Sequence, residues 1–254
     1  LGLEAAGALK NLGIETHVIE FAPMLMAEQL DQMGGEQLRR KIESMGVRVH
    51  TSKNTLEIVQ EGVEARKTMR FADGSELEVD FIVFSTGIRP RDKLATQCGL
   101  DVAPRGGIVI NDSCQTSDPD IYAIGECASW NNRVFGLVAP GYKMAQVAVD
   151  HILSSENAFE GADLSAKLKL LGVDVGGIGD AHGRTPGARS YVYLDESKEI
   201  YKRLIVSEDN KTLLGAVLVG DTSDYGNLLQ LVLNAIELPE NPDSLILPAP
   251  SGSG

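Results

Sequence analysis

Cysteine is scarce in this sequence, which has 254 residues but only Cys98, Cys114 and Cys127. Three cysteines are too few for a disulfide framework, and none is spaced as a CxxC pair for redox chemistry or zinc binding. Their scarcity favours a reducing compartment, so we expect a cytoplasmic protein. The four histidines are too scattered along the chain to form a metal site, and no metal ligands are predicted.

Long apolar runs are absent as well. No segment approaches the ~20 apolar residues that span a bilayer, and the N-terminus lacks the basic and apolar stretches of a targeting signal. Basic residues are in the minority, 23 against 36 acidic residues, and the formal net charge is -13. A field of this sign repels nucleic acid and anionic membranes, which excludes both as expected partners.

The chain has no initiator methionine, and Leu1 opens directly into a helical pattern. We therefore expect a piece cut from a longer polypeptide, in which residues 248–254 are a linker or a tag. The remaining residues have 43% hydrophobic content, enough to form more than one core.

Residues 1–80 are predicted to form a small α/β domain. Apolar spacing indicates a helix that begins at residue 2 or 3 and ends at Gly13, then a short strand at 15–21. A second helix is expected over residues 26–46, with a break near Gly34 and Gly35. Further strands follow, including a hairpin that turns at Asp73-Gly74.

Two more regions follow, at 81–158 and 159–247. The apolar run FIVFSTG (81–87) predicts a buried strand. After it, GGIVIND and DIYAIG predict short strands, and residues 141–153 an amphipathic helix. The third region has alternating strands and a closing helix, which together predict a small α+β domain; these elements are expected at 190–194, 199–206, 212–219 and 227–237.

A dinucleotide-binding turn is indicated at the start of the chain. Such a turn needs glycines for close approach to a pyrophosphate, a helix N-terminus, and an acidic residue about 20 positions later for the ribose hydroxyls. Gly2 fits the third glycine of that pattern and Glu20 the acidic residue. An ordinary helix-strand hairpin, in which Gly2 is only an N-cap, remains the alternative.

Two later segments decide between these interpretations. STGIRP (85–90) and TSDPDIYAIGECA (116–128) resemble the two-dinucleotide-binding flavoproteins, the pyridine nucleotide-disulfide oxidoreductase-like family. The resemblance implies that Gly87 allows close approach to the cofactor. It also implies that Gly125 and Glu126 end a strand whose acidic residue accepts hydrogen bonds from the flavin ribityl chain. That acid is usually Asp, and a helix-capping role is the alternative for Glu126.

VAPGYKMA (138–145) resembles the next segment of the same family, in which a helix N-terminus faces the flavin pyrimidine and stabilises charge that develops on reduction. The resemblance places Pro140, Gly141 and Tyr142 in that turn; a proline-started surface helix is the alternative. Glu4 either lies near the nicotinamide or complements the helix dipole. Because the carboxylate of Glu20 repels a 2′-phosphate, NAD is favoured over NADP. No catalytic residue is assigned.

Taken together, these segments and KLKLLGVDVGGIGD resemble the nitrite reductase branch of the family, the large subunits that use NAD(P)H. The resemblance implies a Rossmann-like nicotinamide domain that lacks its first strand, the C-terminal half of a flavin domain, and an α+β domain. It implies FAD and NAD(P)H as cofactors, with NADH as the electron donor. It also implies an iron-sulfur cluster and siroheme, but only in regions absent from this chain. This sequence itself contains no cysteine cluster with suitable spacing.

Several expectations follow from this resemblance. The remaining domains of the polypeptide and a small subunit are expected partners, and an unpaired sheet edge would allow a homodimer. A rubredoxin- or ferredoxin-type NADH reductase is the second enzyme interpretation, and a non-catalytic folded fragment is the third. We expect the fragment itself to be inactive and to bind flavin weakly. His182 is expected to lie in a solvated turn rather than in a functional site.

Overall fold

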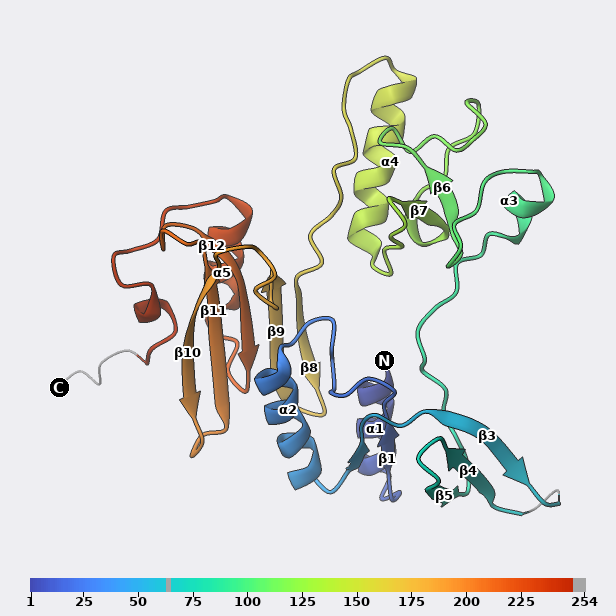
Figure 1. Cartoon of the computed structure of the whole chain (residues 1–254), viewed down its shortest axis with the longest axis vertical. Helices are drawn as coiled ribbons and strands as arrows, with labels where there is room; N and C mark the ends of the chain where they lie inside the picture. The colour runs from blue at the N-terminus through green and yellow to red at the C-terminus, as the bar shows by residue number, and fades with distance from the viewer. Residues whose placement is uncertain (63–64, 249–254) are drawn as a thin grey trace. The chain divides into compact units, whose positions relative to one another are not determined.

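The computed structural model describes residues 1–62 and 65–248, and it divides the chain into two compact units. Unit 1 consists of Leu1–Ser85 together with the residues from Ser165 onwards, and unit 2 of Thr86–Leu164 (Figure 1). The three predicted domains, 1–80, 81–158 and 159–247, stay a prediction. Most of the predicted linker or tag lies outside the described residues.

Unit 1 begins with the predicted helix-strand-helix order, and the elements are α1 (Gly2–Asn11), β1 (His17–Ile19), α2 (Gln32–Ser44) and β2 (Arg48–His50). β1 and β2 pair in parallel, with Val18 opposite Val49. The helix α2 connects them, because parallel neighbours need a crossover. Beyond α1, Gly13 has a φ of +78°, which suits the predicted helix stop.

The predicted break near Gly34 and Gly35 is wrong, because α2 runs through both glycines and starts at Gln32. Asp31 caps the helix and accepts a hydrogen bond from the Gly34 backbone N–H at 3.1 Å. A Cβ at Gly34 would lie 3.0 Å from both the Asp31 carboxylate and the Val217 side chain. These glycines therefore allow close packing at the start of the helix instead of interrupting it.

A separate antiparallel sheet follows in unit 1, with strands in chain order; they are β3 (Thr55–Gln60), β4 (Lys67–Phe71) and β5 (Glu76–Val79). The predicted hairpin is confirmed: β4 pairs with β5, and Gly74 in the turn has a φ of +80°. The predicted strand at 81–87 is wrong. Phe81 and Phe84 are 47% and 69% exposed, and no backbone hydrogen bond joins this segment to another described residue. An apolar run forms a strand only where a neighbour pairs with its backbone.

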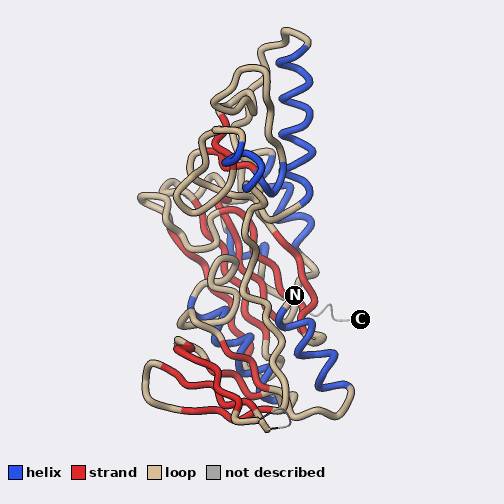
Figure 2. The backbone as a smooth tube through the Cα atoms, turned by 90° about the vertical axis from the view of Figure 1, so that its right-hand side faces the viewer, coloured by secondary structure: helices blue, strands red, loops and turns tan. Residues whose placement is uncertain are grey.

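The C-terminal part of unit 1 is a five-stranded antiparallel sheet in the order β10-β11-β12-β9-β8. Its elements include the closing helix α5 and a short 3₁₀ helix, η2; the bounds are β8 (Ala166–Leu170), β9 (Val173–Gly179), β10 (Arg189–Asp195), β11 (Ile200–Val206), β12 (Leu213–Val219), α5 (Tyr225–Leu233) and η2 (Pro242–Leu245). The predicted alternating strands and closing helix are confirmed (Figure 2). One buried core joins α2 to this sheet through Leu38, Ile42, Val173 and Val217.

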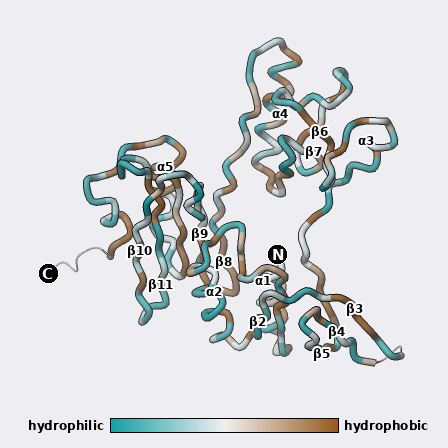
Figure 3. Tube along the Cα trace, in the orientation of Figure 1, coloured by the Kyte–Doolittle hydropathy of each residue, from teal (hydrophilic) through white to brown (hydrophobic). Residues whose placement is uncertain are grey.

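Unit 2 contains a short parallel pair of strands and one long helix; its elements are α3 (Lys93–Gln97), β6 (Ile108–Ile110), η1 (Gly125–Cys127), β7 (Ala128–Trp130) and α4 (Val138–Ile152). The predicted helix 141–153 is confirmed, but it starts three residues earlier. The predicted strand DIYAIG is wrong, because residues 120–125 contribute a single bridge between Tyr122 and Gln115. The strand that pairs with the hydrophobic β6 is β7 instead (Figure 3).

The core of unit 2 surrounds Met144 of α4, together with Phe135 and Phe159. The two phenylalanine rings meet edge to face, with centroids 5.6 Å apart. None of the described helices is both long and apolar enough to cross a bilayer.

Candidate functional site

Two predicted flavin segments meet in unit 2. A Cβ on Gly141, in the first turn of α4, would lie 3.3 Å from the Gly125 Cα in η1. The Gly125 backbone N–H also donates to the Met144 sulfur at 3.2 Å. Gly125 has a φ of +75°, a conformation that favours glycine. The two glycines therefore let the η1 turn lie directly against the helix N-terminus.

Glu126 follows in the same turn and lines an open pocket of about 340 Å³. The rest of the lining comes from Cys127 and from the segment Ile88–Arg91. Gly87 stands immediately before that segment with a φ of +89°, and no atom lies within 4 Å of the Cβ position there. The pocket thus brings the two predicted segments 85–90 and 116–128 together. The prediction that Glu126 ends a strand is wrong, because Glu126 lies in a 3₁₀ turn.

The N-terminus of α4 has no side-chain cap. Pro140 is buried at the third helical position and carries no N–H, whereas Val138 and Ala139 retain first-turn N–H groups that have no partner within the helix. Tyr142 points away from the core and is 75% exposed. This end of α4 can therefore offer backbone donors and a positive dipole end to a ligand.

The predicted nucleotide residues lie in unit 1. Gly2 opens α1, and a Cβ there would lie 3.5 Å from the Ser85 side chain, which is ordinary contact. Glu4 is exposed in the first turn of the same helix. Glu20 directly follows β1, and its carboxylate Oε1 accepts a hydrogen bond from the Ala22 N–H at 2.8 Å. No hydrogen bond among the described residues engages its second oxygen.

Next to Glu20, the paired strands bring together two histidines that are far apart in the sequence. The His17 Nδ1 and His50 Nε2 atoms lie 3.0 Å apart, and the rings are stacked. Burial lowers the pKa of His50, and the neighbouring His17 lowers it further. The sequence alone does not predict this contact, because it depends on the parallel pairing of β1 with β2. His182 lies in a turn of unit 1, and its Nε2–H donates to the Glu28 carbonyl oxygen at 3.3 Å.

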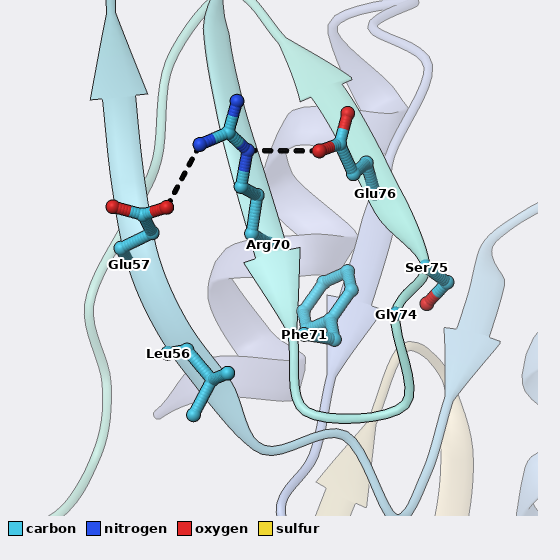
Figure 4. A pocket seen from close by; sticks show the side chains of 7 residues that line it. All are labelled: Leu56, Glu57, Arg70, Phe71, Gly74, Ser75 and Glu76. Atoms are coloured by element: carbon cyan, nitrogen blue, oxygen red, sulfur yellow. Dashed lines mark hydrogen bonds and ion pairs between the residues drawn. The ribbon is translucent and has the colours of Figure 1, made fainter.

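A second hollow, of about 370 Å³, lies on the β3-β4-β5 sheet and contains none of the predicted site residues. Arg70 crosses it and binds Glu57 on one side and Glu76 on the other, both at 2.8 Å (Figure 4). The charges of Arg70, Glu57 and Glu76 are therefore paired with one another across the three strands. The hollow therefore resembles an ordinary sheet surface more than a ligand site.

Two polar clusters in unit 1 were not predicted. Tyr201 is buried, and its hydroxyl donates to Asp31 at 2.6 Å. Lys202 is also buried, and its ammonium binds Asp221 and Asp224 at 2.7 and 2.6 Å. The residues of each cluster are far apart in sequence, so no local sequence pattern predicts these contacts. Among the described residues, no group of His, Cys, Asp and Glu could hold a metal ion.

Comparison with known proteins identifies the family. The model of the pyridine nucleotide-disulphide oxidoreductases matches residues 1–151, and that of the rubredoxin NAD+ reductase C-terminal domain matches residues 165–236. Over its whole length the chain is 99% identical to the nitrite reductase (NADH) large subunit of Escherichia coli (strain K12) and 57% identical to the nitrite reductase [NAD(P)H] large subunit of Klebsiella oxytoca.

The chain spans 30% and 26% of the length of these two relatives. Among solved structures, an FAD-dependent pyridine nucleotide-disulphide oxidoreductase from Desulfovibrio vulgaris is 25% identical, with a TM-score of 0.69 over 89% of this chain and 58% of that one. The first family model covers more than half of the chain, including every predicted site residue. The chain therefore belongs to the pyridine nucleotide-disulphide oxidoreductase family.

Proposed function

We propose that this chain is the electron-input part of an NAD(P)H-dependent nitrite reductase large subunit. In this proposal NADH is the donor, FAD is the first acceptor, and electrons continue to an iron-sulfur cluster and siroheme held outside this chain, where nitrite is reduced to ammonia. Family membership implies FAD and NAD(P)H binding, and the 99% identical relative is named as an NADH nitrite reductase. The observation that carries the proposal is the meeting of Gly125, Glu126 and Gly141 in unit 2.

The residues of unit 2 fit a flavin. Gly87 and Gly125 leave open space where a side chain could obstruct a planar ligand, and both have positive φ, whereas Gly141 lets the Gly125 backbone pack against α4. Glu126 would accept hydrogen bonds from ribityl hydroxyls, since a carboxylate is an acceptor. The uncapped α4 N-terminus, with Pro140 in its first turn and Tyr142 just beyond it, would stabilise negative charge on the ring. When bound, FAD accepts a hydride from reduced nicotinamide and passes electrons onward.

The residues of unit 1 fit a nicotinamide dinucleotide. Gly2 opens α1, and its backbone is exposed at the N-terminus of that helix. A phosphate would be stabilised at such a helix end. The second oxygen of Glu20 would accept from a ribose 2′-hydroxyl and repel a 2′-phosphate, which supports NADH over NADPH. Glu4 would lie beside the nicotinamide. We propose no catalytic residue in the chain.

Replacement of Glu126 tests the flavin site. We would introduce Glu126→Gln into the full-length Escherichia coli relative and measure FAD affinity by flavin absorbance after dialysis. Hydrogen bonds to a charged acceptor contribute about 1.5–3 kcal/mol, so we expect FAD affinity to fall about 10- to 100-fold. Glu156→Gln, an exposed carboxylate of the same unit, is the matched control. Equal FAD affinity for both variants would show that Glu126 does not hold the flavin.

A rubredoxin- or ferredoxin-type NADH reductase is the second candidate function, because the C-terminal model is that of a rubredoxin NAD+ reductase. NADH oxidation by the full-length protein with nitrite or with rubredoxin as acceptor separates the two. The three cysteines are free, which supports our proposal of a cytoplasmic protein. Pairing between exposed sheet edges of two copies would support the proposed homodimer.

A further inference from the structure

Exposed basic side chains gather at one place in unit 2, although the chain as a whole is strongly acidic. Arg89, Arg91 and Lys93 follow one another at every second position, and Arg105 is exposed as well. We call these four residues the basic patch. The formal net charge of the chain is -13, so a local concentration of positive charge stands out against its surroundings.

Packing holds the parts of the patch together. Asp92, between Arg91 and Lys93, accepts a hydrogen bond from the Gly107 backbone N–H at 2.7 Å. A Cβ at Gly106 would lie 3.4 Å from the Pro90 ring. The loop that carries Arg105 therefore packs directly against the segment that carries Arg89 and Arg91. The two segments that carry the four positive charges are therefore neighbours in unit 2.

The basic patch forms no ion pair with an acidic side chain among the described residues. No carboxylate of the described residues lies within 4 Å of its charged groups, even though Glu126 lines the same pocket as Arg89 and Arg91. Elsewhere, by contrast, Arg39, Arg66 and Arg70 each bind two carboxylates. Arginine presents a planar fork of donors that matches a carboxylate, so the patch retains unused capacity for anions.

Exposed apolar residues flank the charges. Ile88 is 54% exposed and Leu94 is 73% exposed. Arginine beside exposed aliphatic side chains is typical of a protein-protein contact, in which apolar groups are buried at the centre and charges fix the orientation. A site for a small inorganic anion would not require these aliphatic groups.

We propose that the basic patch docks an acidic surface of the protein or domain that accepts electrons from this chain. Nucleic acid and an anionic membrane fit less well, because each extends far beyond the patch and meets the negative charge of the remaining surface. A protein face of limited size meets only the patch, since charges are screened over ~8 Å at physiological ionic strength. Arg89 and Arg91 also line the pocket of Glu126, so the docked partner lies at the mouth of that pocket. This inference rests on the proposed function.

Binding of a fluorescein-labelled poly-L-glutamate peptide, followed by fluorescence anisotropy, tests the patch. We expect Arg89→Ala/Arg91→Ala to weaken binding about tenfold and to reduce its dependence on salt. Arg184→Ala/Arg189→Ala removes two exposed arginines from unit 1 and is the matched control. An equal loss in both variants would overturn the proposal, as would tighter binding of a DNA oligonucleotide or of phosphatidylserine vesicles at the same residues.

The peptide-binding assay and the FAD-affinity assay test the docking surface and the proposed function separately. If poly-L-glutamate binding depends on Arg89 and Arg91 but FAD affinity does not depend on Glu126, the proposed flavin site fails while the docking surface stands. If FAD affinity depends on Glu126 and peptide binding is insensitive to the arginines, the docking surface fails alone. Far-UV circular dichroism of each variant checks that it remains folded.

Discussion

Replacement of Asp31 by alanine should destabilise unit 1 through two separate effects. Asp31 caps α2 by accepting from the Gly34 N–H at 3.1 Å. Its other carboxylate oxygen, Oδ2, accepts from the Tyr201 hydroxyl at 2.6 Å and from Arg203 at 3.0 Å. One carboxylate thus joins the beginning of α2 to the strand β11. No local sequence pattern predicts this contact.

The size of the effect follows from what each donor loses. Loss of an N-cap costs about 1 kcal/mol. The Tyr201 hydroxyl is buried and would be left without an acceptor, which costs about 1–3 kcal/mol. Arg203 is partly exposed and keeps its bonds to the Ser190 hydroxyl, so it adds little. We expect Asp31→Ala to lower the free energy of unfolding by about 3 kcal/mol and Tyr201→Phe by about 1 kcal/mol.

Urea unfolding followed by far-UV circular dichroism measures these values. The double variant Asp31→Ala/Tyr201→Phe removes the orphaned hydroxyl and should lose only about 2 kcal/mol, less than Asp31→Ala alone. Trp130 is the only tryptophan and lies in unit 2, so its fluorescence reports that unit separately. Simple additivity in the double variant, or a loss below about 1 kcal/mol for Asp31→Ala, would refute the reasoning.

Two further perturbations test the C-terminal sheet. Burial opposes ionisation of Asp221, but hydrogen bonds from Lys202 and Ser223 outweigh it and lower its pKa to about 2. The folded pKa lies below the unfolded value, so this stabilisation is present above about pH 4 and is lost as the pH falls toward 2; Asp221→Asn should reduce that dependence in urea midpoints measured from about pH 5 downward. Gly215→Ala would place a Cβ 2.5 Å from the Asp180 backbone and should cost at least about 1–3 kcal/mol in thermal unfolding, whereas Gly226→Ala, with no atom within 4 Å, should be neutral or stabilising; equal effects would contradict the packing argument.

Elements that find their partners nearby in sequence were predictable. The hairpin at Gly74 and the strands β10 to β12 pair with their neighbours along the chain, so alternation and turn residues suffice. The incorrect predictions share a different cause. The run 81–87 is apolar enough for a buried strand, but strand formation depends on a partner that no local pattern specifies. The pair Gly34-Gly35 is typical of a helix break, and the contact that explains Gly34 is with Val217, which lies far away in sequence.

The candidate site divides in the same way. Gly87, Glu126 and Gly141 could be proposed as site residues from the sequence because each belongs to a short motif. Their arrangement was not predictable, and the contact of Gly125 with Gly141 depends on how η1 meets α4. Arg89 and Arg91 were overlooked for a related reason, since surface arginines carry no periodic signal.

Unpaired basic groups lie beside the motif residues of unit 2. In unit 1, arginines on α2 and on the β3-β4-β5 sheet are each matched by carboxylates a few residues or one strand away. Such exposed ion pairs contribute little stability, but they leave no unpaired charge to bind a partner. The basic patch and the uncapped N-terminus of α4 have no such partners among the described residues, and they lie beside the motif residues. Because an exposed ion pair adds so little stability, its absence beside a motif costs the fold little and leaves these groups available to ligands and partners.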